Sequence, residues 1–192
     1  MSDFLFYLKQ GIGHITNPSG IDHMVFVITL CAVYRLDQWR QLLVLVTAFT
    51  IGHSLTLALS ASNIIHVSSS LVEFLIPVTI LLTSIYNVSI KQTTRKFGYN
   101  YLLALFFGLI HGMGFSNYFR AMMTGIDDSS ILKPLFSFNV GIEMGQLLIV
   151  SVFMLTLFCF TKFMKVAHRD WNLYISGAGG GLAFTMIIKS LL

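Results

Sequence analysis

Charged residues are scarce in this chain of 192 residues: Asp, Glu, Lys and Arg together make up only 10% of it. A soluble domain has about 25% charged residues because its surface faces water. The hydrophobic fraction of 55% is also above the value of about 45–50% that is usual for soluble domains. Low charge combined with long apolar runs excludes an ordinary soluble domain and indicates an integral membrane protein.

Cysteine is nearly absent as well. Only Cys31 and Cys159 occur, each within an apolar run, and no Cys-x-x-Cys pair is present. The sequence therefore excludes the common thiol-based zinc and redox motifs. It also has no glycine-rich phosphate loop and no nucleic-acid-binding motif. The net charge of +4 comes from Lys and Arg in short loops between apolar runs, where basic residues set membrane orientation.

Six apolar stretches predict membrane-spanning helices. Five of them reach roughly the 20 residues that a crossing needs, and the first is shorter. A short helix over residues 3–15 is predicted to lie in the membrane interface, because Leu5, Leu8, Ile12 and Ile15 recur at helical spacing. The predicted fold is an all-α polytopic bundle of six transmembrane helices with this N-terminal interfacial helix, in one domain, residues 1–192. The predicted spans are 20–34, 41–60, 71–90, 99–119, 134–161 and 173–192.

Basic residues follow the first, third and fifth predicted spans. Because basic loops stay in the cytoplasm, both chain termini are predicted to lie outside it. The opposite loops contain only Arg120 and Lys133. The basic loops contain Arg35 and Arg40, then Lys91, Arg95 and Lys96, and finally Lys162, Lys165 and Arg169.

The few ionisable residues inside the spans fall on one side of the membrane. With this orientation, five of them lie in the outer half, and Glu143 lies deeper, roughly 13 Å into the fifth span at 1.5 Å per residue. Ionisable groups in a membrane are costly and usually face a partner or a functional site. Imidazoles with carboxylates suit zinc, nickel, copper or iron. The predicted metal ligands are His23, His53, His111, Asp22, Glu143 and Glu73.

Simpler roles remain open for several of these residues. Asp22 and Glu73 each stand three residues after a serine, so each could only complete a capping box at a helix start. His23 and His53, taken singly, could form interhelical hydrogen bonds. His14 lies close to the same outer face and could either complete the site or lie in the interface without a partner.

Five short motifs occur in order along the chain: Gly20-Ile21-Asp22-His23, residues 47–57 around His53, Val72-Glu73, residues 111–115 beginning His-Gly-Met, and residues 138–146 around Glu143. Together they resemble the HupE/UreJ family of small bacterial membrane proteins. The resemblance implies a secondary nickel or cobalt permease of the bacterial inner membrane. The nickel-permease branch has a His-Pro pair before Gly-x-Asp-His, whereas this chain has His14-Ile15, so it resembles the less characterised branch.

The favoured interpretation is a divalent metal permease whose partners are membrane lipid and a nickel, cobalt or zinc ion. One alternative is an intramembrane metal-dependent hydrolase, in which the metal activates a water and Glu143 or Glu73 acts as general base. Another is a non-catalytic metal receptor or assembly partner. In the inner half of the bundle, only Thr83, Ser84 and Asn87 of the third predicted span offer a partial polar path.

Overall fold

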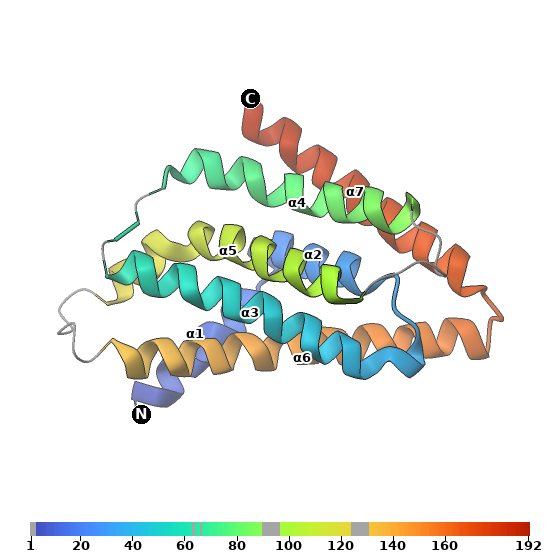
Figure 1. The fold of residues 1–192 in the computed structure, drawn as a ribbon, viewed down its shortest axis with the longest axis horizontal. Helices are drawn as coiled ribbons and strands as arrows, with labels where there is room; N and C mark the ends of the chain where they lie inside the picture. Colours follow the sequence, from blue (N-terminus) through green and yellow to red (C-terminus); the bar gives the residue numbers. More distant parts are fainter. Residues whose placement is uncertain (1–2, 63, 66, 90–96, 124–130) are drawn as a thin grey trace.

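The computed structural model of the chain describes residues 3–62, 64–65, 67–89, 97–123 and 131–192. These residues form α-helices, two short 3-10 turns and connecting loops, without a strand, as the all-α prediction requires. The basic residues Lys91, Arg95 and Lys96 lie outside the described residues. The helices in Figure 1 are α1 (Asp3–Thr16), α2 (Ile21–Cys31), α3 (Trp39–Ala61), α4 (Ser69–Ser89), α5 (Phe97–Met122), α6 (Leu132–Lys162) and α7 (His168–Leu191).

Four of these helices are long and apolar enough to cross a membrane by length and composition. They are α3, α4, α5 and α6, which correspond to the second to fifth predicted spans. The first predicted span contains only the apolar 11-residue helix α2. The sixth predicted span is helical as α7, but this helix is not among the candidate spans of the described residues.

Helices α2 to α6 run roughly along the long axis of the molecule, and α1 and α7 are inclined to it (Figure 1). In Figure 1, α1 and α2 follow one another in the same direction, whereas α3 to α7 run alternately back and forth. The linkers after α2 and α6 meet at one end, where a ring nitrogen of His168 lies 2.9 Å from the carbonyl oxygen of Tyr34. Two of the predicted basic loops, which contain Arg35 and Lys165, therefore lie at the same end of the bundle.

The helix predicted over residues 3–15 is present as α1, and it packs along the first half of α6. The two backbones approach so closely that a Cβ atom at Gly141 would clash with the carbonyl oxygen of Leu8. One turn earlier, Ser137 donates a hydrogen bond to the carbonyl of Phe4. Because both contacts advance together along the two chains, α1 runs parallel to α6 as part of the bundle.

Helices α3 and α5 form a second close pair. A Cβ atom at Gly112 would lie only 2.5 Å from the carbonyl oxygen of His53, so a larger residue there would force the helices apart. Across the same contact, Thr56 donates a 2.9 Å hydrogen bond to the carbonyl of Leu109. Gly108 and Gly112, spaced four residues apart around His111, thus allow the close helix approach. It holds the backbones of His53 and His111 side by side.

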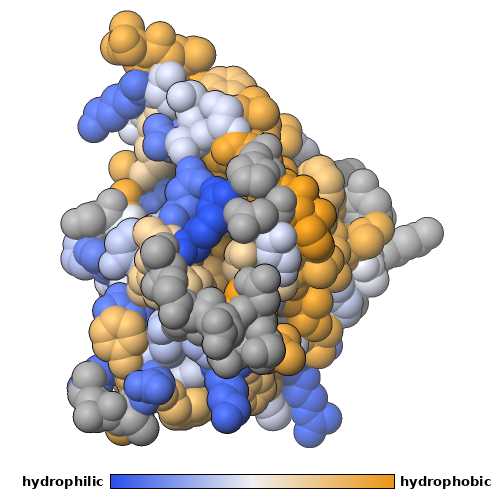
Figure 2. All heavy atoms as spheres, turned by 90° about the vertical axis from the view of Figure 1, so that its left-hand side faces the viewer, coloured by the Kyte–Doolittle hydropathy of each residue, from blue (hydrophilic) through white to orange (hydrophobic). Residues whose placement is uncertain are grey.

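The opposite end of the bundle, where α1, α4 and α6 begin, has a polar surface. Figure 2 looks onto this end and shows hydrophilic residues near its centre, with hydrophobic residues towards the top and right. Here Asn117 donates a 3.0 Å hydrogen bond to Ser69 and accepts one of 2.6 Å from Arg120. A polar end and apolar flanks are the surface pattern of a bundle that spans a membrane.

Candidate metal centre

The helical path of the chain is interrupted between α1 and α2, in the middle of the bundle. Helix α1 ends at Thr16, and a 3-10 turn, Pro18–Gly20, leads directly into α2. Just before the break, the side chain of Ile15 packs against Gly145, which lies near the middle of the 31-residue α6. The break therefore lies about halfway along α6, with the short helices α1 and α2 on either side of it.

The start of α2 differs from the prediction. Gly20, rather than Ser19, is the N-cap residue of α2, so the helix begins one residue later than the predicted capping box requires. Asp22 is the second residue of α2 and so lies in its first turn, where the helix dipole favours a negative charge. Its carboxylate lies directly beside the ring of His23.

Four histidine rings meet beside this break, and we call them the histidine cluster: His14 from α1, His23 from α2, His53 from α3 and His111 from α5. The ring centre of His23 lies 4.5 Å from that of His14, 6.0 Å from that of His53 and 5.2 Å from that of His111. Two imidazoles bound to one ion at about 2.1 Å have ring centres about 5 Å apart. The observed spacings match that arrangement.

The histidine cluster contains ring nitrogens that lack hydrogen-bond partners. His23, His53 and His111 are at most 5% exposed. Each buried polar atom without a partner costs about 1–3 kcal/mol, so several together need an explanation. A shared cation would account for one nitrogen of each ring, the one with the lone pair. Among the described residues, the unpartnered buried ring nitrogens are Nε2 of His14, both nitrogens of His23, both nitrogens of His53, and Nδ1 of His111.

Thr79 of α4 determines which nitrogen of His111 faces the histidine cluster. The Thr79 hydroxyl donates its only hydrogen to the carbonyl of Ile76 at 2.6 Å. Its oxygen also lies 3.0 Å from Nε2 of His111, so this ring nitrogen must carry the hydrogen and donate it. The neutral imidazole then has its lone pair on Nδ1, the atom without a partner. A hydrogen bond that fixes the tautomer in this way is usual behind a metal-binding histidine.

Asp22 adds a carboxylate to the histidine cluster. Its Oδ2 lies 3.2 Å from Nδ1 of His23, although the two atoms are not aligned as a hydrogen bond. One ligand atom from each of Asp22, His23 and His111 lies within 4.8 Å of the others, close enough to share a metal ion. Asp22 can therefore either bind a cation itself or orient the ring of His23.

The other two predicted carboxylates lie outside that ligand group. Glu143 is partly exposed and accepts a 2.8 Å hydrogen bond from Thr47. Glu73 is exposed in the first turns of α4. On the same side of α6 as Glu143, Gln146 accepts a 2.8 Å hydrogen bond from Thr50. The structure thus brings the ring of His53 near Asp22, His23 and His111. The ligand atoms of His14 and His53 lie outside the group within 4.8 Å, as do those of Glu73 and Glu143.

His14 is the member of the histidine cluster that sequence reasoning left undecided. Its ring lies beside that of His23 because α1 packs inside the bundle. Gly141 and Gly145, spaced four residues apart in the fifth predicted span, allow this approach. That spacing was visible in the sequence and could have indicated a close helix partner for residues 3–15.

Apolar helices around a buried His/Asp group indicate the class: an integral membrane protein with a candidate metal-binding group in its interior. A family model described as HupE / UreJ protein matches residues 1–189, and the chain belongs to that family. The resemblance inferred from the short motifs is therefore confirmed. Comparisons with curated proteins and with solved structures gave no significant match.

Proposed function

We propose that this protein is a permease that moves a divalent metal ion of the nickel or cobalt type across the bacterial inner membrane. The supporting observation is that His14, His23, His53 and His111 have buried ring nitrogens without hydrogen-bond partners and that their rings gather beside Asp22. Membership of the HupE/UreJ family, which relates to nickel and cobalt, supports the same function.

The donor set favours a borderline transition metal as the cargo. Imidazole nitrogens suit nickel, cobalt, zinc and copper, whereas magnesium and calcium prefer oxygen ligands. Cys31 and Cys159 are on α2 and the second half of α6, and neither belongs to the ligand group, so no thiolate selects a cuprous ion. Nickel, cobalt and zinc are therefore the ions to test.

We assign six crossings to the chain, with α1 and α2 together forming the first. Their 14 and 11 residues span about 37 Å at 1.5 Å per residue, which exceeds the ~30 Å hydrocarbon core. The 24 residues of α7 span about 36 Å and form the last crossing. The end that contains Arg35 and Lys165 is cytoplasmic by the positive-inside rule, which leaves both termini outside.

The broken first crossing favours transport. Many transporters bind their substrate near the bilayer midplane between two half-helices, where backbone groups and helix ends face the site. Here the turn from Pro18 to Gly20 lies about halfway along α6, directly before Asp22 and His23. The hydrolase alternative needs a carboxylate base next to the metal, and the two candidates, Glu73 and Glu143, lie outside the ligand group.

The test combines metal binding with uptake. We expect purified wild-type protein to bind one metal ion, and we expect alanine variants of His14, His23, His53 and His111 each to lose most of it. His168→Ala is the control, because His168 contacts Tyr34 at the opposite end. Wild-type proteoliposomes should take up labelled nickel, cobalt or zinc. Tight binding without transport of any of the three ions would overturn the permease proposal.

A further inference from the structure

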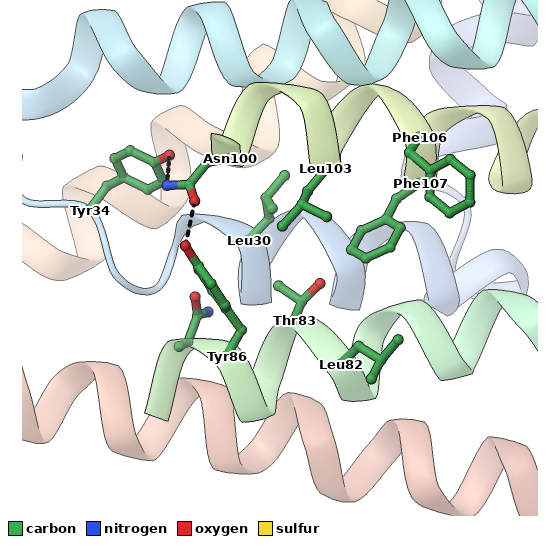
Figure 3. A pocket seen from close by; sticks show the side chains of 10 residues that line it. Leu30, Tyr34, Leu82, Thr83, Tyr86, Asn100, Leu103, Phe106 and Phe107 are labelled. Carbon is green, nitrogen blue, oxygen red and sulfur yellow. Dashed lines mark hydrogen bonds between the residues drawn. The ribbon is translucent and has the colours of Figure 1, made fainter. Parts of the chain in front are cut away.

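A cavity lies in the half of the bundle towards the basic end. It has a volume of about 390 Å³ and lies between α2, α4 and α5. In Figure 3, the side chains of Leu30, Thr83 and Leu103 face this space from the three helices. At one end of the cavity, Tyr86 donates a 2.9 Å hydrogen bond to Asn100, and Asn100 donates one of 3.3 Å to Tyr34. The cavity thus has apolar walls and a polar end.

Asn87 presents only a hydrogen-bond acceptor to the cavity. Its Nδ2 donates to the carbonyl of Thr29 at 2.7 Å and to the hydroxyl of Ser176 at 3.3 Å. Since a carbonyl can only accept, this contact fixes the orientation of the amide. No hydrogen bond to Oδ1 of Asn87 is found among the residues that the structure describes. Asn87 is 2% exposed and lines the cavity, so an acceptor oxygen remains there for a ligand.

Thr83, one turn earlier on α4, also offers the cavity only a hydrogen-bond acceptor. Its hydroxyl donates its hydrogen to the carbonyl of Thr79 at 2.8 Å, which leaves only oxygen lone pairs for the cavity. Thr79 is in turn the residue that holds His111. The stripe of Thr79, Thr83 and Asn87 therefore runs down one face of α4, from the histidine cluster into the cavity.

A short aromatic segment separates the histidine cluster from the cavity. Phe107 lines the cavity and lies one helical turn before His111, which is about 6 Å along α5. The ring centre of Phe26 lies 6.0 Å from that of Phe107 and 4.5 Å from that of His111. A narrow hydrophobic segment of this kind can hold a path closed by excluding water.

We propose that this cavity is the inner subsite of the metal path, where a partly hydrated divalent cation rests on the oxygens of Thr83 and Asn87 before release. The inference rests on the permease function proposed above. Two neutral oxygens and apolar walls bind a cation weakly, and conduction needs a weak site on the exit side. The subsite explains why acceptor-only oxygens lie on the inner half of α4, where most neighbouring residues are apolar.

The competing occupant is a lipid alkyl chain. Leu82 and Phe106 line the cavity and are 51% and 54% exposed on the flank of the bundle, so its mouth borders the lipid. A lipid chain would use the apolar walls and ignore the oxygens of Thr83 and Asn87. Removal of an oxygen should therefore slow metal uptake if the cavity holds a cation, and should leave uptake unchanged if it holds a lipid chain.

The experiment measures metal affinity and uptake rate on the same variants. Thr83→Val removes the oxygen at nearly constant volume, and Leu103→Phe fills the cavity. We expect both to keep the wild-type affinity of the histidine cluster within twofold and to slow nickel or cobalt uptake at least 10-fold. Thr83→Ser should restore uptake. Matched controls are Thr156→Val, which removes an exposed hydroxyl bonded to its own helix, and Leu102→Phe, which enlarges a side chain that is 63% exposed.

Wild-type uptake in both Thr83→Val and Leu103→Phe would overturn the subsite and leave the permease function standing. Absence of uptake in the wild type would instead defeat the permease function and the subsite with it. Thiol labelling of the variant Thr83→Cys, in which Cys31→Ala and Cys159→Ala remove the native thiols, gives a second measurement. A charged thiol reagent should label it from the cytoplasmic side and nickel should slow the labelling. Labelling only by a lipid-soluble reagent would identify a lipid-filled cavity.

Discussion

Thr79 offers the sharpest test of how the histidine cluster is held together. The substitution Thr79→Val keeps the volume of the side chain and removes the oxygen that accepts the hydrogen bond from Nε2 of His111. The imidazole then has two choices. It can keep its hydrogen on Nε2 without a partner, or it can move the hydrogen to Nδ1 and lose the lone pair that faces the cation.

Metal binding weakens because the ion needs the hydrogen on Nε2, whereas the metal-free variant can move it to Nδ1. Leaving a buried donor without a partner costs about 1–3 kcal/mol. Each 1.4 kcal/mol is tenfold in affinity, so the expected loss is about 10- to 100-fold, which is the usual effect of removing the residue behind a metal-binding histidine. Because the histidines themselves remain, one ion should still bind at saturation. The substitution therefore changes affinity without changing stoichiometry.

The assay is competition between purified protein and a chelator of known affinity, with nickel and with zinc. Thr79→Ser should recover most of the lost affinity, because the serine hydroxyl can occupy the same position. Thr156→Val controls for the loss of a hydroxyl on a membrane helix. Unchanged affinity in Thr79→Val would show that Thr79 does not hold His111 in its metal-binding tautomer, and the account of the site would need another explanation for the unpartnered Nδ1.

Three further predictions follow from the packing and the orientation. Gly112→Leu should lower the free energy of unfolding by about 1–3 kcal/mol, because the new side chain meets the His53 backbone. Gly177→Leu, which adds a side chain in open space, is the control and should have little effect in the same thermal melts. A reporter active only in the cytoplasm, fused after Leu192, should be silent, and activity would invert the bundle. Glu143→Gln should slow uptake more than it lowers metal affinity, because this carboxylate bonds Thr47 outside the ligand group; loss of the bound metal would instead make Glu143 a ligand.

The helices were predictable because a membrane leaves few alternatives. Long apolar runs with charged loops between them located α3 to α6, whose backbone polar groups must be satisfied within the helix. The position of α1 was not predictable from its own residues. Its apolar spacing indicates a helix with one apolar face, and that face can pack against lipid or against another helix. Only the close approach of α6 at Gly141 decides between them.

The depth of the site in the membrane was predictable from the sequence. Which face of each helix points towards the centre of the bundle was not. Orientation placed Asp22, His23, His53 and His111 in the same half, and the structure brings them together. Glu73 has a similar predicted depth, yet it is exposed on the outside of the bundle. Its depth could be predicted from its position along the span, but the side of the helix that faces the centre could not. Helix faces depend on tertiary packing, which a single sequence describes poorly for helices that are apolar all round.

The most direct test of the account is X-ray absorption spectroscopy at the metal edge of the purified protein loaded with one equivalent of nickel. The histidine cluster predicts strong imidazole scattering from at least three rings, and this scattering should weaken in the His23→Ala and His111→Ala variants. A metal environment of oxygen ligands alone, or imidazole scattering that both substitutions leave unchanged, would show that these buried histidines do not bind the ion.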